Sequence, residues 1–178
     1  MREAQPPSAL VVLVPEAEAL VGRFRAAHDP TAAAGMPAHI TVLYPFLSPA
    51  QIDDAVLDEA RACFRDFEPF SFELARISRF PGVVYLAPEP AAALKALTLQ
   101  AWDRFPECPP YAGRYPDIVP HLSVASASDE RLLDGVARAF GAAAEPHLPV
   151  RADVSEVVLM VNASERWAVV AACPLGAR

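Results

Sequence analysis

The sequence has few cysteines, and none stands in a pattern that would cross-link the chain or hold zinc. Its 178 residues include only Cys63, Cys108 and Cys173. They are odd in number, widely spaced and without a C-x-x-C pair, which argues against a disulfide framework and against a zinc site. Free thiols favour a reducing compartment, so we expect a cytoplasmic protein. We expect no metal and no other cofactor.

Long apolar runs and an excess of positive charge are also missing. No stretch approaches the ~20 apolar residues that a membrane helix requires, and the apolar run at 8–14 is followed directly by acidic residues and is not framed like a signal peptide. The formal net charge is −7. Since sequence-independent binding of long nucleic acids comes from Lys and Arg, this charge argues against such a partner. We expect a monomeric protein that does not associate with membranes and that binds a small nucleotide or an RNA end.

What is present is typical of a soluble globular domain. Hydrophobic residues make up 53% of the chain and charged residues 21%, which is an ordinary composition for a folded protein. The length fits a single domain, 1–178, built from two lobes. The 19 prolines lie mostly between the apolar segments and so separate the expected elements.

The spacing of apolar residues and the positions of Pro and Gly predict alternating helices and strands. A Pro- and Tyr-rich loop follows the third helix. Strands are expected at 8–14, 38–44, 70–77, 83–87, 121–125, 150–161 and 167–173. Helices are expected at 15–28, 48–67, 90–105 and 128–144.

The two halves of the chain, 8–88 and 89–173, show the same expected order of elements. Pro-x-His-Ile-Thr-Val at 37–42 parallels Pro-His-Leu-Ser-Val at 120–124. Tyr85 and Trp167 follow the two histidines at the same offset. An α+β fold with a duplicated α-β-α-β-β repeat would place equivalent positions opposite each other around a pseudo-two-fold axis. The alternative is a chance recurrence in an alternating chain.

Each of the two similar strands carries a histidine and a hydroxyl on one face. Alternate side chains of a strand share a face, so His39 projects with Thr41, and His121 projects with Ser123. The residues between them are aliphatic and point the other way. Each strand is therefore expected to bury an apolar face and to present an imidazole and a hydroxyl ~6 to 7 Å apart.

This constellation suits the cleavage of a phosphodiester. One imidazole can accept a proton from the attacking water while the other, protonated, hands one to the leaving oxygen. With an unperturbed pKa of ~6.5, histidine populates both states near neutrality. The hydroxyls of Thr41 and Ser123 can donate to the non-bridging phosphate oxygens. The alternatives are packing histidines, or a metal site that would need a third ligand. His28 and His147 lack a hydroxyl at the same offset and are expected to be structural.

The paired motifs resemble the 2H phosphoesterase superfamily, and within it the proteins labelled 2′-5′ RNA ligase or RNA 2′,3′-cyclic phosphodiesterase. The similarity covers nearly the whole chain and includes "PAHITVLYPF", "SRFPGVVYLAP" and "PHLSVA". It implies a bilobal fold with two antiparallel-rich sheets around a central cleft, and metal-independent hydrolysis of a 2′,3′-cyclic phosphate. It also implies His39 as proton donor, His121 as proton acceptor, and phosphate binding by Thr41 and Ser123.

This sequence departs from the family pattern in two respects. Ser123 stands where Thr is commoner, which retains the hydroxyl. Ala125 and Ser126 stand where members that act on RNA often have a basic residue, which weakens the case for RNA. Two other readings therefore stay open: a non-catalytic module that binds nucleotides or RNA ends, and an enzyme acting on another metabolite, such as an ADP-ribose cyclic phosphate.

Loops beside the two strands supply candidate substrate contacts. Arg114 and Tyr115 precede the second motif, and Arg79 and Phe80 stand at the turn between two expected strands. An aromatic ring with an arginine could stack a base and hold a phosphate. The alternative is that these are ordinary loop residues whose aromatic rings anchor the loop to the core.

Overall fold

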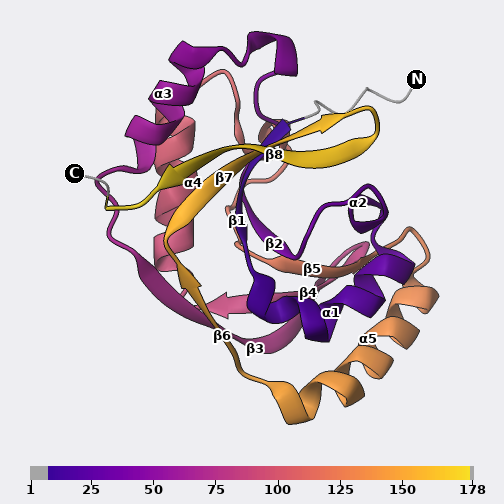
Figure 1. Ribbon diagram of the computed structural model, residues 1–178. Coiled ribbons are helices and arrows are strands. Elements are labelled where there is room, and N and C mark those ends of the chain that lie inside the picture. Colours follow the sequence, from indigo (N-terminus) through magenta and orange to yellow (C-terminus); the bar gives the residue numbers. More distant parts are fainter. Residues whose placement is uncertain (1–7, 177–178) are drawn as a thin grey trace.

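The computed structural model describes residues 8–176 as two four-stranded antiparallel sheets covered by helices on their outer faces (Figure 1). The first sheet has the strand order β2-β1-β7-β8 and the second β5-β4-β3-β6. The strands are β1 Ser8–Leu13, β2 His39–Leu43, β3 Phe70–Phe80, β4 Val83–Glu89, β5 Leu122–Ser126, β6 Val150–Val154, β7 Glu156–Ala163 and β8 Arg166–Pro174. The α-helices are α1 Pro15–His28, α2 Pro30–Ala33, α3 Asp54–Phe64, α4 Ala92–Arg104 and α5 Glu130–Ala144. The predicted α+β class is confirmed.

Each sheet takes strands from both halves of the sequence. β1 and β2 pair with β7 and β8, whereas β3 and β4 pair with β5 and β6. The halves 8–88 and 89–173 therefore do not each form one lobe. The structure instead repeats β1-α1-β2-α3-β3 as β4-α4-β5-α5-β7, and each unit contributes its last strand to the other unit's sheet.

This exchange changes which residues are equivalent. Tyr85 on β4 stands opposite Ser123, while the residue opposite Thr41 is Val11 on β1. Trp167 pairs with Asn162 at the far side of the first sheet. Tyr85 and Trp167 are thus not related by the repeat, and their matched sequence offsets are a coincidence of loop lengths.

Two predicted elements differ from the structure. The strand expected at 150–161 is two strands, β6 and β7, which are separated at Ser155 and belong to different sheets. The helix expected at 48–67 is a 3₁₀ turn, Pro49–Gln51, followed by α3. The side chain of Asp53 caps α3 by accepting from the backbone N–H of Val56 at 2.9 Å, which fixes the later start of this helix.

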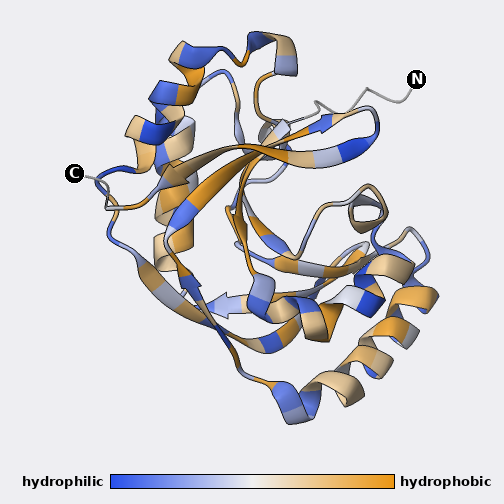
Figure 2. Ribbon diagram, viewed as in Figure 1, coloured by the Kyte–Doolittle hydropathy of each residue, from blue (hydrophilic) through white to orange (hydrophobic). Residues whose placement is uncertain are grey.

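The helices and sheets enclose one main hydrophobic core. α3 packs on β8 and α4 on β2, while α1 and α5 cover β5 and β4. Apolar residues concentrate along the strands in the middle of the molecule (Figure 2). Leu10, Ile40, Leu86 and Leu122 are at most 1% exposed, and each such burial contributes about 1.5–3 kcal/mol. The opposite strand faces carry the polar side chains considered next.

The three cysteines are unpaired and buried. Burial raises the pKa of Cys63 to about 12 and those of Cys108 and Cys173 to about 11, so these thiols remain protonated. Within residues 8–176 no helix is long and apolar enough to cross a membrane.

Candidate active site

The two histidine-bearing strands have the alternation that their sequences predict. Ile40 and Val42 are 1% and 2% exposed, and Leu122 and Val124 are fully buried. His39, Thr41, His121 and Ser123 are all partly exposed. The aliphatic faces fill the core, and this anchoring leaves an imidazole and a hydroxyl of each strand within reach of solvent.

Both imidazoles are held by the same local hydrogen bond. Nδ1 of His39 lies 2.8 Å from the carbonyl oxygen of Pro37, and Nδ1 of His121 lies 2.8 Å from that of Val119. A carbonyl oxygen only accepts, so Nδ1 of each ring carries the hydrogen. The bond thereby fixes the tautomer and leaves Nε2 of each histidine free to accept or donate a proton.

The fold brings the two histidine strands together at the boundary between the sheets. β2 and β5 approach to within 8 Å, Cα to Cα, and lie near the middle of Figure 1. Burial is the main cause of the lowered pKa of His39, and the charge of His121 adds a small further lowering.

The pKa values of both histidines lie below the ordinary value for the side chain. Burial lowers the pKa of His39 to about 4, with a smaller lowering by the charge of Arg25, partly opposed by the bond to Pro37 and by Asp29. Burial also lowers the pKa of His121, against the raising effect of its bond to Val119. Without a bound anion both rings are therefore neutral at pH 7.

A tyrosine links the two strands. The side chain of Tyr111 forms a hydrogen bond with Thr41, and its ring stacks on that of His121 at 6.3 Å between centroids and 26° between planes. Burial raises the pKa of Tyr111 to about 12, so its hydroxyl keeps its proton. Tyr111 therefore contacts the hydroxyl of one motif and the imidazole of the other.

The loop that carries Tyr111 is held in a strained conformation. Tyr111 and Ala112 have φ of 51° and 55°, and Gly113 continues at 70°. A left-handed conformation costs a non-glycine residue about 1–2 kcal/mol, and such strain collects at functional sites. The backbone N–H of Tyr111 donates to the carbonyl of Tyr44, which ties the loop to the end of β2.

Two further rings enclose His121. Phe80 meets the imidazole edge-on at 5.2 Å, and Tyr85 does so at 5.5 Å. Phe80 and Tyr85 stack on each other at 4.3 Å. These rings exclude water from one side of His121, which is the burial that lowers its pKa.

A buried ion pair supports the segment that leads into His39. Arg25 and Asp29 are 1% and 6% exposed, with Nη2 of Arg25 3.0 Å from Oδ2 of Asp29. The other carboxylate oxygen of Asp29 accepts from the backbone N–H of Thr31 at 2.9 Å and caps α2. This network joins α1 to the turn before β2. It also places a positive and a negative charge close enough to His39 to affect its pKa.

The sequence matches a known family over most of its length. The model of the 2′-5′ RNA ligase superfamily matches residues 13–166. The chain belongs to this superfamily.

Solved structures support the fold of this superfamily member. Escherichia coli LigT complexed with 3′-AMP matches with a TM-score of 0.60 at 16% identity, covering 96% of this chain and 98% of the other. The Thermus thermophilus protein TT0787 matches with a TM-score of 0.59 at 16% identity and the same coverage. A protein described as a phosphoesterase matches with a TM-score of 0.58. No curated protein matches significantly in sequence.

The predicted substrate contacts of this superfamily member fall into two groups. Tyr115 meets the ring of Tyr111 edge-on at 5.7 Å, and Arg114 is close enough to Tyr44 to influence its pKa. Phe80 lies against His121. Phe80 is thus brought to the site directly and Tyr115 through Tyr111, whereas Arg114 is placed only near Tyr44, just after β2.

Arg79 is not brought to the site. Its guanidinium binds Glu130 at 2.7 Å and also pairs with Asp134, both on α5. Glu130 additionally accepts from the backbone N–H of Gly82 at 2.6 Å. Because neighbouring side chains of a strand point to opposite faces, Phe80 reaches His121 while Arg79 anchors the β3–β4 turn to α5.

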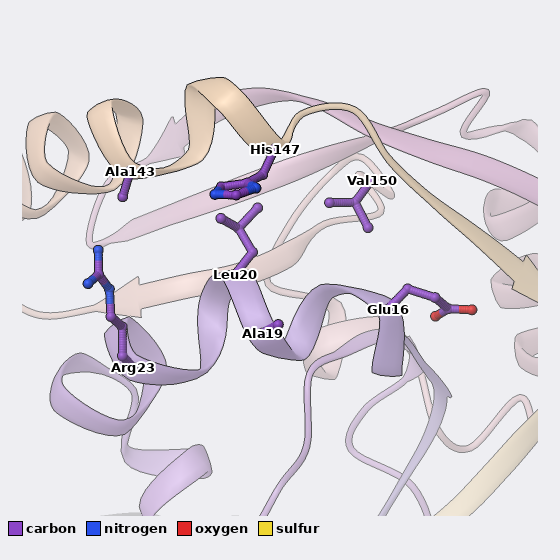
Figure 3. Close-up of a pocket in the computed structure, with 7 residues that line it drawn as sticks. All are labelled: Glu16, Ala19, Leu20, Arg23, Ala143, His147 and Val150. Carbon is purple, nitrogen blue, oxygen red and sulfur yellow. The ribbon is translucent and has the colours of Figure 1, made fainter.

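A separate depression between α1 and the end of α5 contains another histidine (Figure 3). Its cavity volume is about 450 Å³, and none of the four motif residues lines it. The imidazole of His147 lies over Leu20, with Arg23 and Glu16 toward opposite ends. Within residues 8–176 no three His, Cys, Asp or Glu side chains are grouped as they would be around a metal ion.

Sequence reasoning missed Tyr111, Arg25 and Asp29. A tyrosine between Pro-Pro and Ala-Gly marks a constrained loop, and Arg and Asp four residues apart mark a helical pair. Neither signal reveals that the side chains lie beside the histidines, because that proximity depends on how distant segments pack.

Proposed function

We propose that this protein hydrolyses a 2′,3′-cyclic phosphate, at the end of a nucleotide or an RNA, to a phosphomonoester. The observation that carries the proposal is the matched geometry of His39 and His121, whose Nδ1 atoms each bind a backbone carbonyl at 2.8 Å. Two imidazoles with free Nε2 atoms, on strands that approach each other from different sheets, could act as a paired general acid and general base.

In the proposed reaction the two rings start with one proton between them: one imidazole is neutral and the other is protonated at Nε2. Nε2 of the neutral imidazole takes a proton from water as the water oxygen attacks phosphorus. The bond from phosphorus to one ribose oxygen breaks, and Nε2–H of the other, protonated imidazole gives that oxygen its proton. Following the family resemblance, His121 is the acceptor and His39 the donor.

The negative charge of the bound phosphate has to raise the pKa of the imidazole that donates the proton. Since the pKa of His39 is about 4 in the free protein, a donor role requires the anionic substrate to raise it, as a nearby opposite charge does. The hydroxyls of Thr41 and Ser123 would then donate to the non-bridging oxygens as negative charge develops. The Thr41 side chain lies on β2 and is hydrogen-bonded to Tyr111 in the free protein.

The family and the fold are consistent with this reaction. E. coli LigT, whose fold resembles that of this chain, has been crystallised with 3′-AMP, a nucleoside phosphomonoester. Low identity limits that similarity to the fold, so the proposal depends on the residues of this chain.

The direct test is incubation with nucleoside 2′,3′-cyclic phosphates and chromatographic separation of the 2′- and 3′-monophosphates. We expect turnover that is lost in His39→Ala and His121→Ala and retained in His147→Ala, which removes an exposed histidine outside the site. Binding of nucleoside monophosphates without turnover of any cyclic phosphate would instead support the non-catalytic module. Turnover unchanged in both motif variants would remove the mechanism.

A further inference from the structure

The segment that leads into His39 begins at a buried ion pair. Nε and Nη2 of Arg25, in the last turn of α1, donate to Oδ2 of Asp29 at 3.1 and 3.0 Å. Oδ1 of Asp29 accepts from the backbone N–H and the hydroxyl of Thr31 at 2.9 and 2.7 Å. The carbonyl of Thr31 accepts in turn from the backbone N–H of Met36 at 3.0 Å. Hydrogen bonds therefore connect the ion pair to the end of the turn that precedes β2.

The same helix holds the far end of this segment through Glu18. Oε2 of Glu18 accepts from the backbone N–H of Ala38 at 2.8 Å, and the carbonyl of Ala38 accepts from the backbone N–H of Val14 at 2.9 Å. Because an α-helix has ~3.6 residues per turn, Glu18 and Arg25 lie two turns apart on one face of α1. We call Glu18, Arg25 and Asp29 the α1 clamp.

Both attachments of the α1 clamp lead to the carbonyl that orients His39. Pro37 stands between Met36 and Ala38, the two residues whose backbone N–H groups are held by these bonds. The carbonyl oxygen of Pro37 lies 2.8 Å from Nδ1 of His39. A shift of this turn would move the carbonyl away from the ring and release the tautomer that leaves Nε2 free.

The ion pair of the α1 clamp also brings charges of both signs to the ring of His39. Burial is the largest influence on the pKa of His39, while the charge of Arg25 lowers this pKa, that of Asp29 raises it, and His121 on β5 adds a smaller lowering. The hydroxyl of Tyr111 binds the threonine on the same strand and stays protonated, so it adds no charge. Since the desolvation of a buried pair offsets most of its attraction, stability alone does not account for these charges.

We propose that the α1 clamp positions His39 for catalysis by holding the carbonyl of Pro37 against Nδ1, so that Nε2 stays available to the substrate. The catalytic part of this inference rests on the proposed function. The orientation and tautomer of the ring are properties of the free protein and can be measured without a substrate.

The first test is ¹⁵N NMR of the imidazole rings in the free protein at pH 7, which shows which ring nitrogen carries the hydrogen. In the parent, His39 and His121 should both carry it on Nδ1. Glu18→Ala and Asp29→Ala should each convert His39 to a mixture of tautomers. His121 binds the carbonyl of Val119 instead, so its tautomer should not change, and it is the internal control in each sample.

The variants of Glu18 keep this test decisive even if loss of the buried pair prevents folding. Glu18 is exposed, so Glu18→Ala should fold. Glu18→Gln retains an oxygen that can accept from Ala38 and should restore the parental tautomer of His39. A His39 ring that keeps its hydrogen on Nδ1 in Glu18→Ala, or an equal change in both rings, would overturn the proposal.

The second test uses the opposite charges of the ion pair. Asp29→Asn removes the negative charge and keeps an oxygen that can accept from Thr31, whereas Arg25→Met removes the positive charge. The pH at which kcat falls through loss of the proton on His39 should therefore decrease in Asp29→Asn and increase in Arg25→Met. The double variant Arg25→Met/Asp29→Asn leaves no buried charge unpaired and should remain close to the parent.

Damage to packing alone would lower kcat in both single variants without moving the pH profile in opposite directions. That result would overturn the role assigned to the charges.

The two tests separate this inference from the proposed function. A changed tautomer of His39 in Glu18→Ala, without turnover of any cyclic phosphate by the parent, would retain the α1 clamp and reject the hydrolysis. Turnover by the parent, with unchanged tautomers and unmoved pH profiles in the variants, would retain the hydrolysis and reject the α1 clamp.

Discussion

The surroundings of His39 and His121 differ although their backbones match. Each ring binds the carbonyl two residues before it at 2.8 Å. Beyond that bond, His39 lies in the field of a buried Arg25–Asp29 pair, whereas His121 is enclosed by aromatic rings from β3, β4 and the loop after α4.

In the proposed mechanism, this difference would let the two copies of a duplicated unit perform two chemical roles. The repeat gives both histidines the same tautomer and leaves Nε2 of each ring free. The surrounding side chains come from positions that the repeat does not relate, so they can set the proton affinities separately. Unequal environments for paired titratable groups are how enzymes distinguish an acid from a base.

Removing each imidazole in turn should have the largest effect, and it tests whether the two histidines have different roles. His39→Ala and His121→Ala should each lower kcat on a 2′,3′-cyclic phosphate by about 10²–10⁴-fold, the usual contribution of a positioned acid or base. A nucleotide p-nitrophenyl ester, whose leaving group departs without a proton, should separate the two roles. On that ester His39→Ala should lose less than on the cyclic phosphate, while His121→Ala should lose as much. The opposite pattern would exchange the assigned roles.

The hydroxyls provide a second, smaller comparison. Thr41→Val and Ser123→Ala should each reduce kcat/KM by about 10- to 100-fold, since a hydrogen bond to a charged group is worth about 1.5–3 kcal/mol. Thr41→Ser keeps the hydroxyl and should retain most of the activity. Steady-state kinetics of the three variants test this, and a loss in Thr41→Ser equal to that in Thr41→Val would point to packing rather than to phosphate binding.

The pH dependence should reflect the low proton affinity of both rings. The active free enzyme holds one proton on the pair, and both pKa values lie below 6.5. That proton is lost as the pH rises past the higher of the two pKa values, so kcat/KM should already be falling at pH 6.5 and should approach a tenfold fall per pH unit above it. An anionic substrate raises both pKa values, so the corresponding fall in kcat should appear at higher pH. A kcat/KM that stays constant from pH 5 to 8 would contradict paired imidazoles.

The sequence was sufficient to predict the elements that local periodicity determines. α1 occupies Pro15–His28 as predicted, because a proline begins it, Glu16 and Glu18 stand in its first turn, and Arg25 and His28 stand in its last. The alternation around His39 and His121 was equally local, since every second residue of each strand is aliphatic.

The pairing of strands could not be predicted from local patterns. The apolar run at 150–161 reads as one strand, but the chain leaves one sheet and enters the other at Ser155. That change is determined by partners distant in sequence. For the same reason local patterns do not reveal that the two repeat units exchange their last strands, or that Tyr111 reaches both motifs from an irregular loop.

Tyr111 permits the finest test of the comparison, because it binds the hydroxyl of the His39 motif while stacking on the ring of His121. Tyr111→Phe keeps the stacked ring and removes the hydrogen bond to Thr41. A neutral hydrogen bond contributes about 0.5–1.5 kcal/mol. If Thr41 has to exchange this partner for the phosphate, the variant should lower KM by about two- to tenfold with little change in kcat. If the tyrosine hydroxyl instead holds Thr41 in position for the phosphate, KM should rise. Tyr111→Phe in a Thr41→Val background, where the interaction with Thr41 is already absent, is the matched control. A fall in KM would show that Tyr111 competes with the phosphate for the Thr41 hydroxyl, and a rise would show that Tyr111 holds that hydroxyl in place.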